Sequence, residues 1–381
     1  MMKVFEVFWR FLALGCVSFG GPAAHIGYFQ RVFVQKLNWV DAESYARLIS
    51  LSQFLPGPGS SQIGFALGLR RAGIWGGMAA FAGFTLPSFL LLYILAVANT
   101  DYQAGSFFPG IIKGLKLLAV VVVADATSSM FKSFCKDKSS IALAVFTAVF
   151  VLTLPSIWTQ LAALTVAALI GIIRSQNSGT TNDFAIRIRW FSLGVFLVLF
   201  IGLPVTAMLS PWLELLSDFY QSGSLVFGGG HVVLPLLQQT LGEAISTDRF
   251  LLGYAAAQAV PGPMFSLAAF LGAELSPGTA FMGAALATLG IFLPGFLLIL
   301  SFQGAWEDLA RRPKVAGAVW GINASVVGLL MSALYKPVFV SAVTSSLAMA
   351  LVMIGLFALN YLRLPIVILV IAFAAAGALL L

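Results

Sequence analysis

Two ionisable residues lie in or directly beside an apolar run of the chain, where a charged side chain could bind an ion or carry a proton. Lys116 lies within the run 111–123, and Asp125 follows just after it. An ionisable side chain inside a membrane segment is costly, so it indicates a functional site by default. Lys116 could bind an anion, or its long side chain could extend to the outer headgroups. Asp125 could carry a coupling proton or pair with a cytoplasmic lysine, and the pairing is the favoured interpretation.

Polar side chains also stand beside breaks rich in glycine and proline. The only two histidines, His25 and His231, each follow a glycine motif, and Gln53 and Gln258 each precede a Pro-Gly-Pro motif. Histidine can donate a hydrogen bond to an oxyanion or titrate near neutral pH, and the simpler alternative is a structural bond to the broken backbone. Glutamine amides at such places can bind an ion or cap a helix end.

The breaks occur twice along the chain. Phe19-Gly20-Gly21-Pro22 is repeated as Phe227-Gly228-Gly229-Gly230, and Pro56-Gly57-Pro58 is repeated as Pro261-Gly262-Pro263. A third pair, 83–89 and 290–296, has nearly the same spacing, and this spacing places Asn323 opposite Lys116. The chain therefore consists of two homologous halves. We predict a first repeat at 1–175, a linker with a connecting transmembrane helix at 176–209, and a second repeat at 210–381.

A broken helix in a membrane exposes backbone groups that can bind an ion. The N-terminal end of a helix carries a partial positive charge and free N–H groups, which bind anions. Glycine lets an oxyanion approach the backbone, although glycines can also serve only to pack helices closely. The matched breaks favour a central anion site. Its candidate residues in the two halves are Gly20, Gly21, His25, Gln53, Pro56, Gly57, Pro58 and Lys116, then Gly228, Gly229, Gly230, His231, Gln258, Pro261, Gly262, Pro263 and Asn323.

The composition identifies the kind of protein that positions these groups. Of 381 residues, 60% are hydrophobic and 9% are charged, whereas a soluble domain has about 25% charged residues. The apolar stretches are continuous runs of about 20 residues and do not alternate as β-barrel strands do. We therefore predict an all-α polytopic membrane protein, with the lipid bilayer as its surroundings.

The charges indicate that the two halves face opposite ways. Residues 1–72 hold seven Lys or Arg, and the equivalent stretch 210–277 holds only Arg249. The connection 99–109 has no Lys or Arg, whereas its counterpart 304–314 has three. Because positive loops stay in the cytoplasm, equivalent loops lie on opposite sides, as in an inverted-topology repeat. This places the N-terminus in the cytoplasm and the C-terminus outside. The predicted spans are 73–98, 110–131, 140–154, 158–173, 190–209, 278–303, 315–335, 338–358 and 364–381.

Each half begins with segments that are too short to span the bilayer. The helical patterns at 4–18, 26–37, 42–54 and 60–70 flank the glycine and proline breaks, and each is shorter than the about 20 residues that a span needs. We interpret them as re-entrant helical hairpins, with two tilted and kinked full spans as the alternative. In either case protein must surround the broken backbone, because lipid cannot bond to it.

Several other functions lack support in the sequence. No nucleophile–base pair, phosphate-binding loop or haem motif occurs, so we predict no catalytic residues and no cofactor. No Cys/His cluster occurs, so no metal site is predicted. The net charge is +7, but the basic loops are short and lack interleaved aromatic residues, so nucleic acid is not a predicted partner. Glu6 and Arg10 interrupt the first apolar run, which argues against a cleaved signal peptide.

Taken together, the motifs resemble one known family. Phe19-Gly20-Gly21-Pro22 with His25, the two Gln-x-x-Pro-Gly-Pro motifs, Gly76-Gly77 and Leu86-Pro87, and Phe227–Gly230 with Leu234-Pro235 are similar to the chromate transporter family in its long, two-domain form. The resemblance covers both halves. It implies efflux of chromate across the bacterial inner membrane and resistance to chromate, with sulfate as the natural competitor. The sequence departs from internal symmetry where Trp39 has no counterpart and where Asn323 replaces Lys116.

The residues and the resemblance predict one mechanism. A tetrahedral oxyanion binds between the hairpins of the two halves, and the halves then expose it alternately to the two sides. A homodimer is a candidate assembly. Two alternatives stay open at this point: an importer of sulfate or another oxyanion, and an anion channel built from the same helix ends.

Overall fold

The computed structural model describes residues 1–98, 107–175, 188–227, 230–305 and 312–381, and all regular elements in these ranges are helical. The first half and the connecting segment contain α1 (Met2–Val17), α2 (Gly21–Phe29), η1 (Gln30–Lys36), α3 (Ala42–Phe54), α4 (Gly59–Ala98), α5 (Phe107–Phe134), α6 (Lys138–Thr153), α7 (Ile157–Ser175), α8 (Trp190–Thr206) and η2 (Ala207–Leu209). The second half contains α9 (Pro211–Leu225), η3 (Gly230–Val232), α10 (Val233–Leu241), η4 (Gly242–Ala244), α11 (Thr247–Ala259), η5 (Met264–Ser266), α12 (Leu267–Glu274), η6 (Pro277–Thr279), α13 (Ala280–Phe302), α15 (Pro313–Ala333), η7 (Leu334–Phe339), α16 (Val340–Ala342), α17 (Ser346–Asn360) and α18 (Ile366–Leu380).

The apolar helices confirm a polytopic membrane protein. Five described segments are long and apolar enough to cross a bilayer: Gly59–Ala98, Trp158–Ser175, Trp190–Leu209, Pro277–Phe302 and Pro313–Ala342. In contrast, α6, α17 and α18 have 15 or 16 residues, which corresponds to about 22–24 Å against a hydrocarbon core of about 30 Å. The predicted spans at 140–154, 338–358 and 364–381 are therefore short helices.

The largest difference from the predicted boundaries lies after α15. The predicted segment 315–335 continues through η7 and α16 as far as Ala342, and the next helix begins at Ser346 instead of residue 338. The backbone at Lys336 is not helical, with φ −128° and ψ 116°, and Pro337 follows it inside the same tract. Proline lacks the N–H of a helical bond and kinks the chain without ending the tract here.

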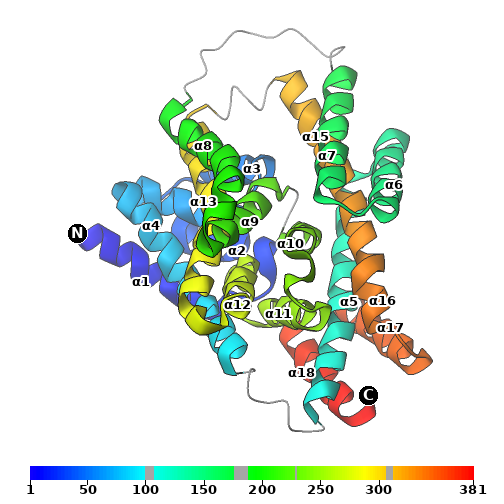
Figure 1. Ribbon diagram of the computed structural model, residues 1–381. Coiled ribbons are helices and arrows are strands. Elements are labelled where there is room, and N and C mark those ends of the chain that lie inside the picture. Colours follow the sequence, from blue (N-terminus) through cyan, green and yellow to red (C-terminus); the bar gives the residue numbers. More distant parts are fainter. Residues whose placement is uncertain (99–106, 176–187, 228–229, 306–311) are drawn as a thin grey trace.

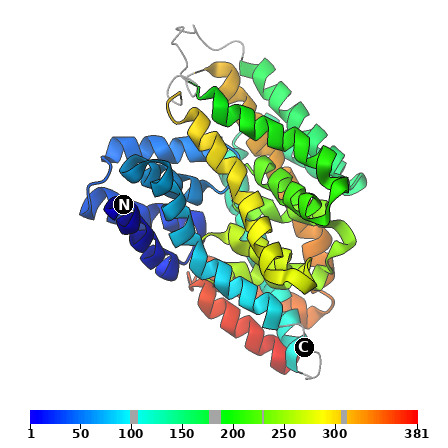
Figure 2. The same ribbon diagram turned by 60° about the vertical axis from the view of Figure 1, so that its left-hand side comes forward.

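The segments at the start of each half are short, as predicted. The helix α3 covers 42–54, and the helix α4 begins just after the Pro-Gly-Pro motif. A kink at Ala72 and Gly73 divides α4, because these residues leave the helical region and Gly73 has φ +66°. Figure 1 shows α1 beside α4 on the left of the molecule, and α9 packs against α13 in the same way in the second half. The helix α13, yellow in Figure 2, also contacts α4 and α12.

The two halves bond to each other at their breaks in a reciprocal way. The N–H of Gly57 donates to the carbonyl of Val226 at 2.7 Å, and the N–H of Gly262 donates to the carbonyl of Ser18 at 3.0 Å. The internal repeat makes Gly57 equivalent to Gly262 and Ser18 equivalent to Val226. The two hydrogen bonds are therefore equivalent as well. Each Pro-Gly-Pro motif thus satisfies the backbone at the first break of the opposite half, which gives the molecule a pseudo-two-fold arrangement.

On the right of Figure 1, the helices α5 and α15 are exchanged between the halves: each packs mainly on helices of the half to which it does not belong. The helix α5 packs on α18 and α17, whereas α15 packs on α7 and α6. Glycines permit the close approach at both places: Gly114 lies against Phe373 and Gly377, and Gly317 lies against Gly171. Such contacts between small residues are a common way to join helices in membranes. The exchange means that neither half completes its own bundle.

We predict that Gly57→Ala destabilises the protein by about 1–3 kcal/mol, because a side chain is strained at this backbone conformation. Gly57 has φ +120°, and an added Cβ would lie 3.0 Å from the Cα of Gly295. Thermal unfolding of the purified protein in detergent measures the effect. Gly27→Ala is the matched control, since nothing lies within 4 Å of its added Cβ. Equal stability of the two variants would contradict the role of the contact.

Candidate functional site

A cavity of about 450 Å³ lies where the breaks of the two halves meet. Its volume falls within the range of small-molecule sites, about 300–1,000 Å³. It is formed by the start of α2, the turn between α3 and α4, the last turns of α5 and one residue of the second half. The lining residues are Pro22, Ile26, Ser52, Gln53, Leu55, Gly57, Gly59, Ser60, Ser129, Met130, Ser133, Phe134 and Gly230.

The local chemistry of this cavity favours an anion. The helix α2 begins beside it at Gly21, with Gly20 as the N-cap at φ +98°, and α4 begins beside it at Gly59. Gly59 and Ser60 line the cavity from the first turn of α4, where N–H groups have no partner within the helix and the helix end carries a partial positive charge. Pro22, which lines it from the first turn of α2, has no N–H.

The hydroxyl of Ser129 adds a further donor, whereas those of Ser52 and Ser133 donate to backbone carbonyls of their own helices. None of the described lining residues is an aspartate or a glutamate. The cavity offers neutral hydrogen-bond donors to a negative ligand.

The two histidines have structural partners beside this cavity. His25 is fully buried; its Nδ1 lies 3.1 Å from the Oγ of Ser60, and its Nε2 lies 3.2 Å from the carbonyl of Ser18. The Nδ1 of His231 lies 2.8 Å from the hydroxyl of Tyr254. Neither ring lines the cavity. His25 reaches it through Ser60, whose hydroxyl it can orient.

One of the three glutamines beside the breaks lines the cavity, and the other two contact other parts of the protein. Gln53 is exposed and lines the cavity, whereas the amide of Gln258 contacts the sulfur of Met264. Gln62 is fully buried, and its Nε2 donates to the carbonyl of Pro56 at 2.9 Å and to that of Gly295 at 3.2 Å. These two bonds fix the first Pro-Gly-Pro turn against α13 of the other half.

Of the remaining predicted site residues that the structure describes, only Gly57 and Gly230 line the cavity. Pro56, Pro58, Pro261, Gly262 and Pro263 form the two turns that follow α3 and α11, and of the first motif only Gly57 lines the cavity. Asn323 is buried in α15, and its Oδ1 has no hydrogen-bond partner. Asp125 borders a different cavity, together with Lys132 and Asn360. Gly228 and Gly229 lie outside the described residues, and Gly230 contacts the cavity.

Lys116 forms an ion pair away from the cavity. Its Nζ lies 2.7 Å from the Oδ1 of Asp248, and the two side chains are 10% and 61% exposed. The pair joins α5 to the start of α11. The proposed contact between Lys116 and substrate stays a prediction, because the lysine does not line the cavity described here.

Three lining serines were not among the predicted site residues. Ser52 precedes the first Pro-Gly-Pro motif, and Ser129 and Ser133 lie one turn apart near the end of α5. The spacing of Ser129 and Ser133 places both on one helix face, which is the only signal in the sequence for them. Among the described residues, no three His, Cys, Asp or Glu side chains gather as metal ligands would.

Comparisons with known proteins match both halves. The sequence profile described as "Chromate transporter" matches residues 5–172 and 213–378, which confirms two homologous halves. A chromate transport protein of Pseudomonas aeruginosa is 26% identical over 85% of this chain and 79% of its own length. A chromate transport protein of Cupriavidus metallidurans is also 26% identical, over 85% and 80%. An uncharacterized transporter of Methanocaldococcus jannaschii is 25% identical over 99% and 94%. No solved structure matches significantly.

We predict that Lys116→Gln lowers anion flux several-fold, because it removes the ion pair between α5 and α11. The exchanged variant Lys116→Asp with Asp248→Lys should recover most of this loss, since it restores the attraction with its charges reversed. Flux into reconstituted vesicles, normalised to the amount of folded protein, is the measurement. If the charge-reversed double variant folds well but its anion flux does not recover, Lys116 instead has a direct role with the substrate.

Proposed function

The chain belongs to the chromate transporter family, and we propose that it exports chromate or a related tetrahedral oxyanion from the bacterial cytoplasm across the inner membrane. The observation that carries the proposal is the cavity of about 450 Å³ at the paired breaks. The N-terminus of α4, the amide of Gln53 and the hydroxyl of Ser129 offer donors to it, and no carboxylate of the described residues lines it. A dianion with four oxygens can use many such donors at once.

In this proposal the backbone does most of the binding. The N–H groups of Gly59 and Ser60 at the start of α4 hold the oxyanion, and Ser129 donates from its hydroxyl, whereas the hydroxyl of Ser60 donates to the Nδ1 of His25. Gln53 adds an amide from the end of α3. Hydrogen bonds from neutral donors to an ionised ligand are stronger than bonds between two neutral groups. The site therefore needs no resident cation to hold a dianion.

Movement of the two bodies provides alternating access in this proposal. The helical hairpins around α4 and α13 form one body, and the exchanged bundle of α5, α15 and their partners forms the other. The cavity lies between them, because its lining comes from α2, α3 and α4 on one side and from α5 on the other. Moving two negative charges outward is assisted by an inside-negative potential of about 100 mV, by roughly 4–5 kcal/mol.

We predict that reconstituted vesicles carry chromate in a saturable way and show counter-flow. Ser129→Ala should raise the half-saturating concentration several-fold, because the variant loses a hydroxyl donor inside the cavity. Ser50→Ala is the matched control, since the Ser50 hydroxyl is exposed and bonds only within its own helix, to Ala46. Unitary currents would indicate a channel, and net uptake of sulfate into expressing cells would indicate an importer; either result would overturn the proposed exporter.

Opposite orientation of the halves is tested by labelling. Arg70 lies at the end of the first segment of α4, and Gly278 in η6 lies one residue from the equivalent place. We predict that, after replacement of the exposed Cys16, a membrane-impermeant thiol reagent reaches Arg70→Cys only from the cytoplasmic side. It should reach Gly278→Cys only from the outside. Labelling of both residues from one side would show that the halves are parallel.

A further inference from the structure

A second cavity, of about 330 Å³, lies between helices of both halves and shares no lining residue with the site described above. It is formed by the turn between α6 and α7, by α10 and the start of α11, and by the junction of α15 with η7. Its lining residues are Val151, Leu152, Pro155, Gln160, Pro235, Gln238, Gln239, Gly242, Thr247, Leu329, Ser332, Ala333, Lys336 and Pro337.

The polar groups of this cavity suit an anion. Lys336 is the one charged residue among the described residues that line it, and no ion pair of Lys336 occurs in the described part of the chain. Gln160 is only 2% exposed, yet its Oε1 has no hydrogen-bond partner. A buried amide without a partner is costly, and its two ends can exchange by rotation so that the NH₂ faces a ligand.

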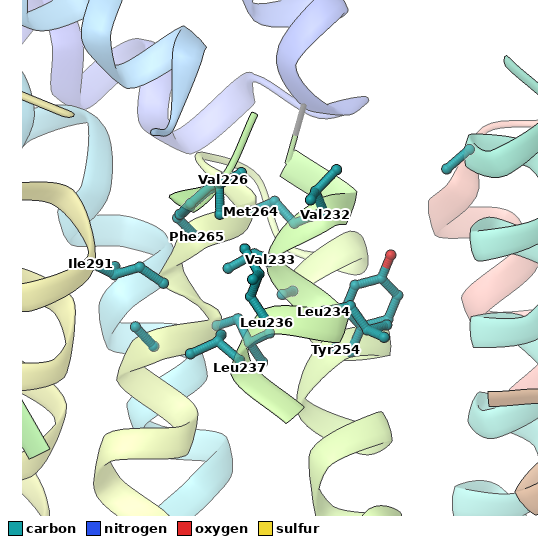
Figure 3. Packing of buried hydrophobic residues seen from close by; sticks show 14 of the residues in the cluster. Val226, Val232, Val233, Leu234, Leu236, Leu237, Tyr254, Met264, Phe265 and Ile291 are labelled. Atoms are coloured by element: carbon teal, nitrogen blue, oxygen red, sulfur yellow. The ribbon is translucent and has the colours of Figure 1, made fainter. Parts of the chain in front are cut away.

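Two consecutive short elements, η3 and α10, connect the two cavities. Gly230, at the start of η3, lines the first cavity, whereas Pro235, Gln238 and Gln239 of the following α10 line the second. From Gly230 to Gln238 the helical rise is about 12 Å at 1.5 Å per residue. The opposite face of α10 is buried, and Figure 3 shows Val233 and other apolar side chains of this helix packed together. The polar face of α10 is thus left to the cavity.

The second cavity is also partly equivalent to the first by the internal repeat. The spacing that relates Gly114 to Gly321 also relates Ser129 and Met130 to Lys336 and Pro337. These residues lie near the ends of α5 and of the α15 tract, which the predicted topology places on opposite sides of the membrane. A serine in the first cavity therefore corresponds to a lysine in the second.

We propose that the second cavity is a second oxyanion-binding site on the transport path, on the side opposite the first, with Lys336 as its cation and Gln160 and Gln238 as donors. The nature of the anion rests on the proposed function. The exporter releases its substrate through this cavity, because α10 leads from the first site into it. The ammonium of Lys336 attracts the dianion after it leaves the neutral donors of the first site.

Protection of a nearby cysteine tests the site without measuring transport. Leu152→Cys, in a chain from which Cys16 and Cys135 have been removed, places a thiol at the edge of the cavity and leaves its polar groups intact. The probes are sulfate and molybdate, tetrahedral dianions that do not oxidise thiols, compared with chloride at equal ionic strength. We expect both dianions to slow modification by a membrane-impermeant thiol reagent in vesicles.

Lys336→Gln should raise the sulfate concentration for half protection about tenfold, as expected for the loss of one charge-assisted bond. Lys113→Gln is the matched control, because it removes an exposed lysine whose Nζ bonds to the carbonyl of Leu381 and which does not line the cavity. Absence of protection, or protection that survives Lys336→Gln, overturns the site. Chromate flux is measured separately: flux without protection overturns this site alone, and protection without flux overturns the proposed function alone.

Discussion

The structure depends on one constraint: backbone groups freed by a break in a membrane helix must find partners inside the protein. The chain meets this constraint across its two halves. The N–H of Gly57 bonds to the carbonyl of Val226, and the N–H of Gly262 bonds to the carbonyl of Ser18. Each half thus completes the other, and neither break can be satisfied in the same way by a single half. The exchange of α5 and α15 between the bundles repeats this dependence at a second place.

The same contacts support the proposed anion site at the breaks. The carbonyl of Ser18 also lies 3.2 Å from the Nε2 of His25, and His25 reaches Ser60 on the wall of the first cavity. The carbonyls of Ser18 and Val226 at the breaks are therefore used within the protein, whereas Gly59 and Ser60 at the start of α4 line the cavity with N–H groups that have no partner within the helix. This imbalance favours a negative ligand. A positive φ at Gly57 is part of the arrangement, because the turn must bring its N–H to the opposite half.

Local patterns in the sequence predicted the helical segments and the internal repeat. They did not predict which side chains of different helices contact each other. The bounds of α3 and the positions of the breaks follow from helical periodicity and from glycine and proline, which act on their own neighbours. The pairing of Lys116 with Asp248 joins residues on α5 and α11, and no local pattern identifies it. The continuation of α15 past Pro337 was missed for a related reason: packing against α5 outweighs a local break signal.

The difference between the two cavities would give transport by the proposed exporter a direction. A perfect two-fold would bind the dianion equally at both ends, and the membrane potential alone would then decide where it leaves. Ser129 and Lys336 break this equality, since one is neutral and its counterpart is a cation. An attraction near 4 Å between unit charges is about 4 kcal/mol at an effective dielectric constant of 20, which is comparable with the work done by the potential on two charges. In the proposed exporter, the duplicated framework therefore supplies the path, and a substitution within the duplication biases the substrate toward one end of it.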